Sequence, residues 1–221
     1  MTRCYLVRHA QTAWNEENRI QGRSDRPLDA TGLAQAERLA RRFASHHVAG
    51  LFTSHLLRSR STAEAIATPH GAGQAGNGHP VSAVIEPDLA EMHLGAWEGL
   101  TPAEVDARFA SAYQRWREQP SSVLIPESEP VHAFRERVRQ VFGRLTARMG
   151  QGDYVVVSHG GVIAAILADV LGAEYDYLLR RLRLDNAGVT AIELDAPTPH
   201  VLWVNSTTHL EPASLAPSTW F

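Results

Sequence analysis

The sequence is poor in cysteine and has no long hydrophobic run. Cys4 is the only cysteine in 221 residues, so the chain cannot form an internal disulfide. No stretch reaches the ~18 consecutive apolar residues that a membrane-spanning helix requires. The N-terminus leads directly into strand-like sequence instead of an apolar secretory segment. These absences predict a cytoplasmic protein without a membrane partner.

Strong net charge and metal-ligand spacing are also missing. The formal net charge is −3 and the pI is about 6.4, so no overall basic field would attract nucleic acid. Any anion must therefore be bound locally. The His-x-x-x-His and Cys/His spacings of zinc sites do not occur, which predicts no metal and no cofactor. Residues 69–80 contain four glycines but lack the lysine of a nucleotide-binding loop, and we expect a surface loop there.

The sequence does contain an alternating pattern of strands and helices. With 44% hydrophobic residues, a chain of this length can bury the core of one α/β domain, so we expect residues 1–221 to form a single domain. Residues 13–27 are expected to be a long loop over the sheet end, and residues 97–130 a helical cap over the site. Asp29 is expected to cap the helix that follows it, and Thr101 the first helix of the 97–130 segment. The expected strands are 5–7, 51–54, 81–85, 153–158, 189–194 and 201–204, and the expected helices are 33–43, 56–67, 131–149 and 162–171.

Two of the expected strands end in a histidine. Arg8 and His9 follow the first strand, and His159 follows a later one, so both imidazoles are aimed at the carboxyl edge of a sheet, where open α/β folds place their sites. The charge of Arg8 disfavours imidazolium and leaves His9 a free lone pair, which makes it a nucleophile beside a phosphoryl group. After His159, Gly160 opens a helix whose first N–H groups favour an anion.

Four motifs in this order resemble a known family. The chain resembles the histidine phosphatase superfamily, the phosphoglycerate-mutase-like enzymes, over roughly residues 3–210, and most of all its phosphatase branch. The resemblance implies a three-layer α/β/α sandwich with a mostly parallel central sheet and an active site at the carboxyl ends of the strands. The motifs are Arg8-His9-Ala10-Gln11-Thr12, Ser54-His55-Leu56-Leu57-Arg58-Ser59, Glu91 followed by Gly95-Ala96-Trp97-Glu98-Gly99, and Ser158-His159-Gly160-Gly161.

The same resemblance implies a role for each site residue. His9 becomes the phosphorylated nucleophile and Glu91 the proton donor, with His159 in the phosphate pocket. The other expected pocket and substrate-loop residues are Arg8, Asn15, Gln21, Gly22, Arg58 and Gly160. The chemistry of these residues agrees with the implied roles, because two arginines and a protonated His159 could balance the negative charge of a phosphoryl group without a metal. A partly desolvated Glu91 could protonate the leaving oxygen.

Three positions depart from the family pattern. Ala10 stands where the family usually has Gly, His55 where it usually has Pro, and Ser59 where it usually has Ala. A methyl group at position 10 predicts that the turn there does not need a positive φ. None of the three is a reacting group, so activity remains the expectation.

Three functions stay open on the sequence. The favoured one is a phosphomonoesterase for small phosphorylated metabolites, followed by a phosphoglycerate mutase and, last, a phospho-ligand-binding protein without catalysis. The expected cap at 97–130 has three arginines and six carboxylates, and a net charge of −3 disfavours the second phosphate that a mutase must hold. The sequence gives neither the physiological substrate nor the oligomeric state.

Overall fold

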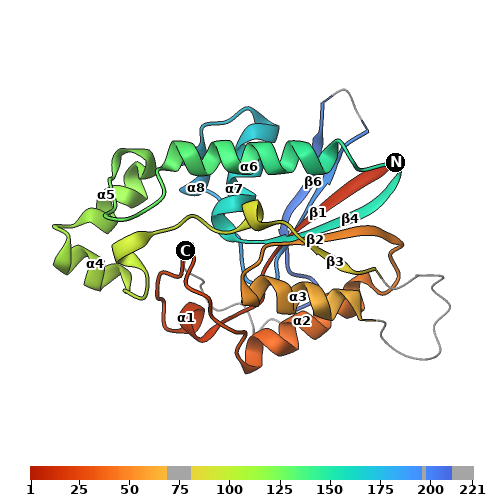
Figure 1. The fold of residues 1–221 in the computed structure, drawn as a ribbon, viewed down its shortest axis with the longest axis horizontal. Coiled ribbons are helices and arrows are strands. Elements are labelled where there is room, and N and C mark those ends of the chain that lie inside the picture. Colours follow the sequence, from red (N-terminus) through yellow and green to blue (C-terminus); the bar gives the residue numbers. More distant parts are fainter. Residues whose placement is uncertain (69–80, 196–197, 211–221) are drawn as a thin grey trace.

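The computed structural model describes residues 1–68, 81–195 and 198–210. Its centre is a six-stranded sheet in the order β3-β2-β4-β1-β5-β6 (Figure 1). The four strands from β3 to β1 are parallel and β5 is antiparallel to both of its neighbours, which confirms a mostly parallel sheet. The strands are β1 (Thr2–Arg8), β2 (Val48–Thr53), β3 (Ala83–Ile85), β4 (Gly152–Ser158), β5 (Val189–Glu193) and β6 (His200–Ser206).

Helices cover both faces of the sheet and complete the three layers. Side chains alternate along β1, so Tyr5 and Val7 enter one hydrophobic core and Cys4 and Leu6 the other. The first core lies under α2 (Ala30–Phe43) and α3 (Leu57–Ala67), and the second under α6 (Val131–Thr146), α7 (Gly160–Leu171) and α8 (Tyr175–Leu179). Figure 1 shows α6 and α7 across the sheet from α2 and α3.

The segment 97–130 forms a helical excursion beyond the sheet (Figure 1). Thr101 and Glu104 form a capping box at the start of α4, as the sequence favours. Trp97 is buried and meets Trp116 edge-on at 5.8 Å between ring centroids, so its indole is part of the core. The elements of the excursion are η2 (Gly95–Trp97), α4 (Pro102–Arg108), α5 (Ala112–Glu118) and η3 (Pro120–Ser122), preceded by η1 (Pro87–Leu89).

Two short helices differ from the sequence prediction. Residues 13–27 were expected to be loop throughout, but α1 (Ala13–Glu16) forms there because Thr12 and Asn15 cap each other's backbone. α8 was not expected, since five residues are too few to show helical periodicity. α6 ends at Thr146, three residues before the expected end, and the expected loop at 69–80 lies outside the described residues.

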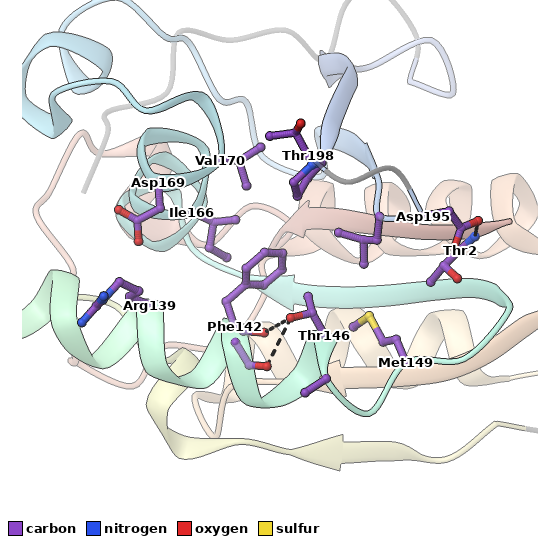
Figure 2. Close-up of a pocket in the computed structure, with 14 residues that line it drawn as sticks. Thr2, Arg139, Phe142, Thr146, Met149, Ile166, Asp169, Val170, Asp195 and Thr198 are labelled. Carbon is purple, nitrogen blue, oxygen red and sulfur yellow. Dashed lines mark hydrogen bonds between the residues drawn. The ribbon is translucent and has the colours of Figure 1, made fainter.

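A surface cavity of about 680 Å³ lies between α6, α7 and the end of β5 (Figure 2). Its lining includes Thr2, the first residue of β1, whereas Arg8 and His9 lie at the other end of that strand. The cavity is therefore distant from the candidate site along the strand. Across the described ranges, no helix combines the length and apolar character needed to cross a bilayer.

Candidate active site

His9 leaves the carboxyl end of β1 as a buried, neutral imidazole. Its Nδ1 lies 2.7 Å from the carbonyl oxygen of Ala10, which fixes the proton on Nδ1. Nε2 then carries the lone pair and accepts a hydrogen bond from Arg58 Nε at 3.2 Å. Burial, and after it the charges of Arg58 and Arg8, hold the His9 pKa well below its usual value. Such an imidazole is a nucleophile at neutral pH. Ala10 is not among the described residues with positive φ, as expected.

Two buried guanidinium groups supply the positive charge around His9. Arg58 comes from the first turn of α3, and its two terminal nitrogens donate to the carbonyls of Ser24 and Gly22 at 2.9 and 2.7 Å. Arg8 donates to the carbonyl of Leu184. The pKa of each guanidinium is lowered to about 10, because the effect of burial outweighs the opposing charge of the Glu91 carboxylate. Both side chains therefore remain charged at neutral pH.

Glu91 is a buried residue that follows η1, and its carboxyl group lies against the first turn of α7. Its oxygens accept hydrogen bonds from the backbone N–H groups of Met92 and Gly161, at 2.9 and 3.0 Å. Burial raises the Glu91 pKa, although the two N–H groups and the nearby Arg58 and Arg8 oppose the rise. A carboxyl group with a raised pKa keeps its proton to higher pH than an exposed glutamate and can give it to a leaving group. The Gly161 N–H, which we expected to be open to an anion, is occupied by this carboxylate.

His159 lies next to His9, with 5.2 Å between the ring centroids. Its Nε2 is 2.8 Å from the hydroxyl of Ser54 at the end of β2. The expectation of a protonated His159 does not hold for the chain by itself, because burial, Arg58, His9 and Arg8 keep its pKa well below the usual value. A dianion held beside the ring would oppose those charges and raise the pKa.

Asn15 presents an unused donor inside the site. Its Oδ1 accepts hydrogen bonds from the Thr12 N–H and from Asn186 Nδ2, at 3.0 and 3.3 Å. Its Nδ2 is buried without a hydrogen-bond partner in the described part of the chain, and so is His159 Nδ1. Leaving such a group unpaired costs ~1–3 kcal/mol. A ligand oxygen would satisfy both.

The predicted substrate loop is held by Glu98, which sequence reasoning did not assign to the site. The Glu98 carboxylate accepts hydrogen bonds from the Arg23 N–H and the Ser24 hydroxyl, at 2.9 and 2.7 Å. Gly22 has φ +50°, and a Cβ there would lie 2.2 Å from Glu98 Oε1, so only glycine fits. Gln21 accepts from the Thr12 hydroxyl at 3.0 Å. These hydrogen bonds fix the substrate loop to Thr12 and Glu98.

Other residues near the site also had no clear sequence signal. Asn186 donates to the His9 carbonyl at 3.0 Å, and Thr62 accepts the Ala10 N–H at 3.0 Å. Gly160 is buried as the first residue of α7, and the residue after it, Gly161, donates its N–H to Glu91. Among residues 1–68, 81–195 and 198–210, no cluster of three or more His, Cys, Asp or Glu could hold a metal ion.

The sequence pattern of the histidine phosphatase superfamily (branch 1) matches residues 4–207. The chain belongs to this superfamily. It is 31% identical over 229 residues to the "Probable phosphoglycerate mutase GpmB" of Serratia proteamaculans, covering 97% of this chain and 98% of that protein. It is 33% identical over 204 residues to the "Probable 2-carboxy-D-arabinitol-1-phosphatase" of Arabidopsis thaliana, covering 90% of this chain and 40% of that protein.

Among solved structures, YhfR of Bacillus stearothermophilus has a similar fold. The TM-score is 0.84 at 28% sequence identity, and the match covers 96% of this chain and all of that chain. Membership in the histidine phosphatase superfamily, together with relatives named as phosphatases, supports a phosphoric monoester hydrolase acting on phosphorylated substrates. Relatives named as mutases keep phosphoryl shuttling as an alternative.

Proposed function

We propose that this chain is a metal-independent phosphomonoesterase that hydrolyses small phosphorylated metabolites through a phosphohistidine on His9. The observation that carries the proposal is the state of that imidazole. Hydrogen bonding to Ala10 places the proton on Nδ1, and the neighbouring Arg58 both meets Nε2 and disfavours imidazolium. This arrangement keeps a nucleophilic lone pair within reach of a positively charged pocket.

The first step transfers the phosphoryl group to His9. Arg58 Nε turns from Nε2 to a phosphoryl oxygen, and Nε2 attacks phosphorus as the P–O bond to the leaving group breaks. The Glu91 carboxyl group gives its proton to the leaving oxygen, which departs as an alcohol. Arg8, Arg58 and His159 stabilise the charge that spreads over the equatorial oxygens.

The second step releases phosphate. The Glu91 carboxylate takes a proton from water, whose oxygen attacks phosphorus as the P–N bond to His9 breaks. The products are inorganic phosphate, neutral His9 and protonated Glu91, so the cycle closes without a metal or redox partner.

The remaining site residues bind and enclose the substrate. Asn15 Nδ2, which has no hydrogen-bond partner among the described residues, donates to a phosphoryl oxygen. Gln21 and Gly22 shape the substrate loop, and Gly160 brings the backbone of α7 close to the anion. We place these functions in one domain, with residues 97–130 as the cap.

Hydrolysis is favoured over phosphoryl shuttling by the charge of the cap. Its cations are few, and Arg115 donates to the Ala110 carbonyl within the cap itself. Of its carboxylates, Glu104 and Glu129 pair with arginines outside the cap, Arg19 at 3.1 Å and Arg137 at 2.8 Å. The cap therefore offers little positive charge to a second phosphate group.

An assay with 3-phosphoglycerate and catalytic 2,3-bisphosphoglycerate separates the two functions. The phosphatase proposal predicts steady release of inorganic phosphate, both from 3-phosphoglycerate and from unrelated monoesters such as nitrophenyl phosphate. Rapid formation of 2-phosphoglycerate without matching phosphate release would instead establish a mutase.

Chelation is expected to leave turnover unchanged. The fixed charges of Arg8 and Arg58 already face the reacting phosphoryl group, so catalysis needs no divalent ion. Activity is measured after dialysis against EDTA and again after adding Mg²⁺ or Zn²⁺. Loss on dialysis with recovery by one of the ions would contradict the proposed mechanism.

Arg58→Met is expected to lower kcat/KM by ~10²–10³-fold, the usual cost of removing one preorganised charge from a transition state. The His9 pKa is lowered by burial and also by the charge of Arg58, so removing Arg58 raises that pKa. The acidic limb of the pH–rate profile should therefore move to higher pH. Arg60→Met, two residues along α3, is the matched control and should leave the limb in place.

A reducing, cytoplasmic setting fits a chain whose one cysteine is a free thiol. Cys4 is a free, fully buried thiol in β1, and burial raises its pKa to about 12. Such a thiol is unreactive toward oxidants and takes no part in the mechanism.

A further inference from the structure

The segment that carries Glu91 has almost no regular structure of its own. It follows η1, a single 3-10 turn, and precedes the bend at Gly95. Within the described part of the chain, the Glu91 carboxyl group accepts its hydrogen bonds from two backbone N–H groups, those of Met92 and Gly161. Its position therefore depends on how firmly the backbone of residues 88–92 is fixed.

Side chains from other elements donate hydrogen bonds to four consecutive carbonyl groups of this segment. The Leu89 carbonyl accepts a hydrogen bond from the Ser158 hydroxyl at 2.7 Å. The carbonyls of Asp88, Ala90 and Glu91 all accept from one guanidinium, that of Arg137 on α6, at 2.5, 2.9 and 3.5 Å. Arg137 thus replaces the hydrogen-bond ladder that the segment lacks.

Arg137 is itself fixed in one orientation. Glu129 accepts from its Nε and Nη2 at 2.9 and 2.8 Å, a bidentate ion pair in which each side chain is only 15% exposed. Its guanidinium also lies 5.2 Å from the ring centroid of buried Phe134. Arg23 of the substrate loop joins the cluster, donating to Glu129 at 3.2 Å and to the Glu91 carbonyl at 3.3 Å.

We propose that Arg137, held by Glu129, is the positioning residue that aims Glu91 at the leaving oxygen. Among the described residues, the hydrogen bonds of Arg137 go to Glu129 and to backbone carbonyls of the Glu91 segment, so Arg137 acts through the position of Glu91. Arg23 links the substrate loop to the same carbonyl, which places loop and proton donor in one hydrogen-bonded unit. The inference rests on the proposed function, in which Glu91 protonates the leaving group.

The test compares two esters that differ in their need for a proton. Glycerol phosphate expels a basic alkoxide, whereas nitrophenyl phosphate expels a stable anion. Arg137→Met should lower kcat/KM, which reports phosphoryl transfer to His9, by ~10²-fold for glycerol phosphate, the cost of a misplaced catalytic group, and by less than about threefold for nitrophenyl phosphate. The later hydrolysis of the phosphohistidine, in which Glu91 also acts, is common to both esters and does not enter kcat/KM. Glu129→Gln, which keeps side-chain size, should give the same selectivity with a smaller loss.

Two controls separate positioning from general destabilisation. Arg139→Met removes another arginine of α6, one that pairs with exposed Glu136, and Arg144→Met removes the partner of the Asp88 side chain. Neither should change the ratio of the two rates. Thermal melting of every variant identifies any that fails to fold, and Glu129→Gln then carries the test.

A double-mutant cycle gives the decisive result. If Arg137 acts through Glu91, adding Arg137→Met to Glu91→Gln should cause no further loss on glycerol phosphate. Independent losses that multiply, or equal losses on both esters, would overturn the inference. The proposed function fails separately, if the wild-type chain releases no phosphate or if Glu91→Gln lowers kcat/KM for both esters alike.

Discussion

His9→Ala is expected to reduce the hydrolysis of every phosphate ester by ~10⁴–10⁶-fold, the largest effect of any substitution in the chain. Removing a nucleophile eliminates the covalent route, and only binding and charge stabilisation by the remaining groups are left.

The structure provides a control for this experiment. His47 is exposed near the start of β2, so His47→Ala changes the same side chain outside the site and should retain full activity. Initial rates on nitrophenyl phosphate measure both variants. Retention of more than about a tenth of wild-type activity by His9→Ala would show that another group attacks phosphorus.

Glu91→Gln is expected to lower kcat for alkyl phosphates by ~10²–10⁴-fold, the range of a lost general acid. Glutamine keeps the shape of the side chain, but its single amide oxygen can accept from only one of the N–H groups of Met92 and Gly161, and it has no acidic proton to give. Nitrophenyl phosphate needs no such proton, so its phosphoryl transfer to His9 should be much less affected.

The pH profile provides a second measure of Glu91. Its raised pKa keeps the carboxyl group protonated to higher pH than an exposed glutamate, and activity on alkyl phosphates falls as pH rises through that pKa. Glu91→Gln should therefore abolish this basic limb. Asp88→Asn, a nearby and more exposed carboxylate in the same segment, is the control. An unchanged limb in Glu91→Gln would assign it to another group.

The sequence predicted the parts of the fold that periodicity and strand ends determine. The runs at Tyr5–Val7 and Val155–Val157 are buried and apolar, so the strands that carry His9 and His159 could be recognised, and parallel pairing then brings the two strand ends together. The Thr101 cap and the Asp29 cap depend on local chemistry alone, and both form as expected.

What the sequence could not give are contacts between residues distant along the chain. Asn186 bonds the His9 carbonyl across 177 positions, and Ser54 meets His159 across 105. Arg137 is one of several arginines of α6, and only the fold shows that its guanidinium donates to the carbonyls beside Glu91. Burial depth, which lowers the His159 pKa in the chain by itself, likewise cannot be counted from residue order.

The most direct test of the account is to trap the phosphoryl group on the chain. Wild-type protein is mixed with ³²P-labelled ester and quenched in alkali within milliseconds, with His9→Ala as the parallel sample. The account predicts a label that is stable in alkali and lost in acid, that appears before free phosphate, and that is absent from His9→Ala. Label that persists in His9→Ala, or phosphate release without any labelled protein in rapid quenching, would contradict it.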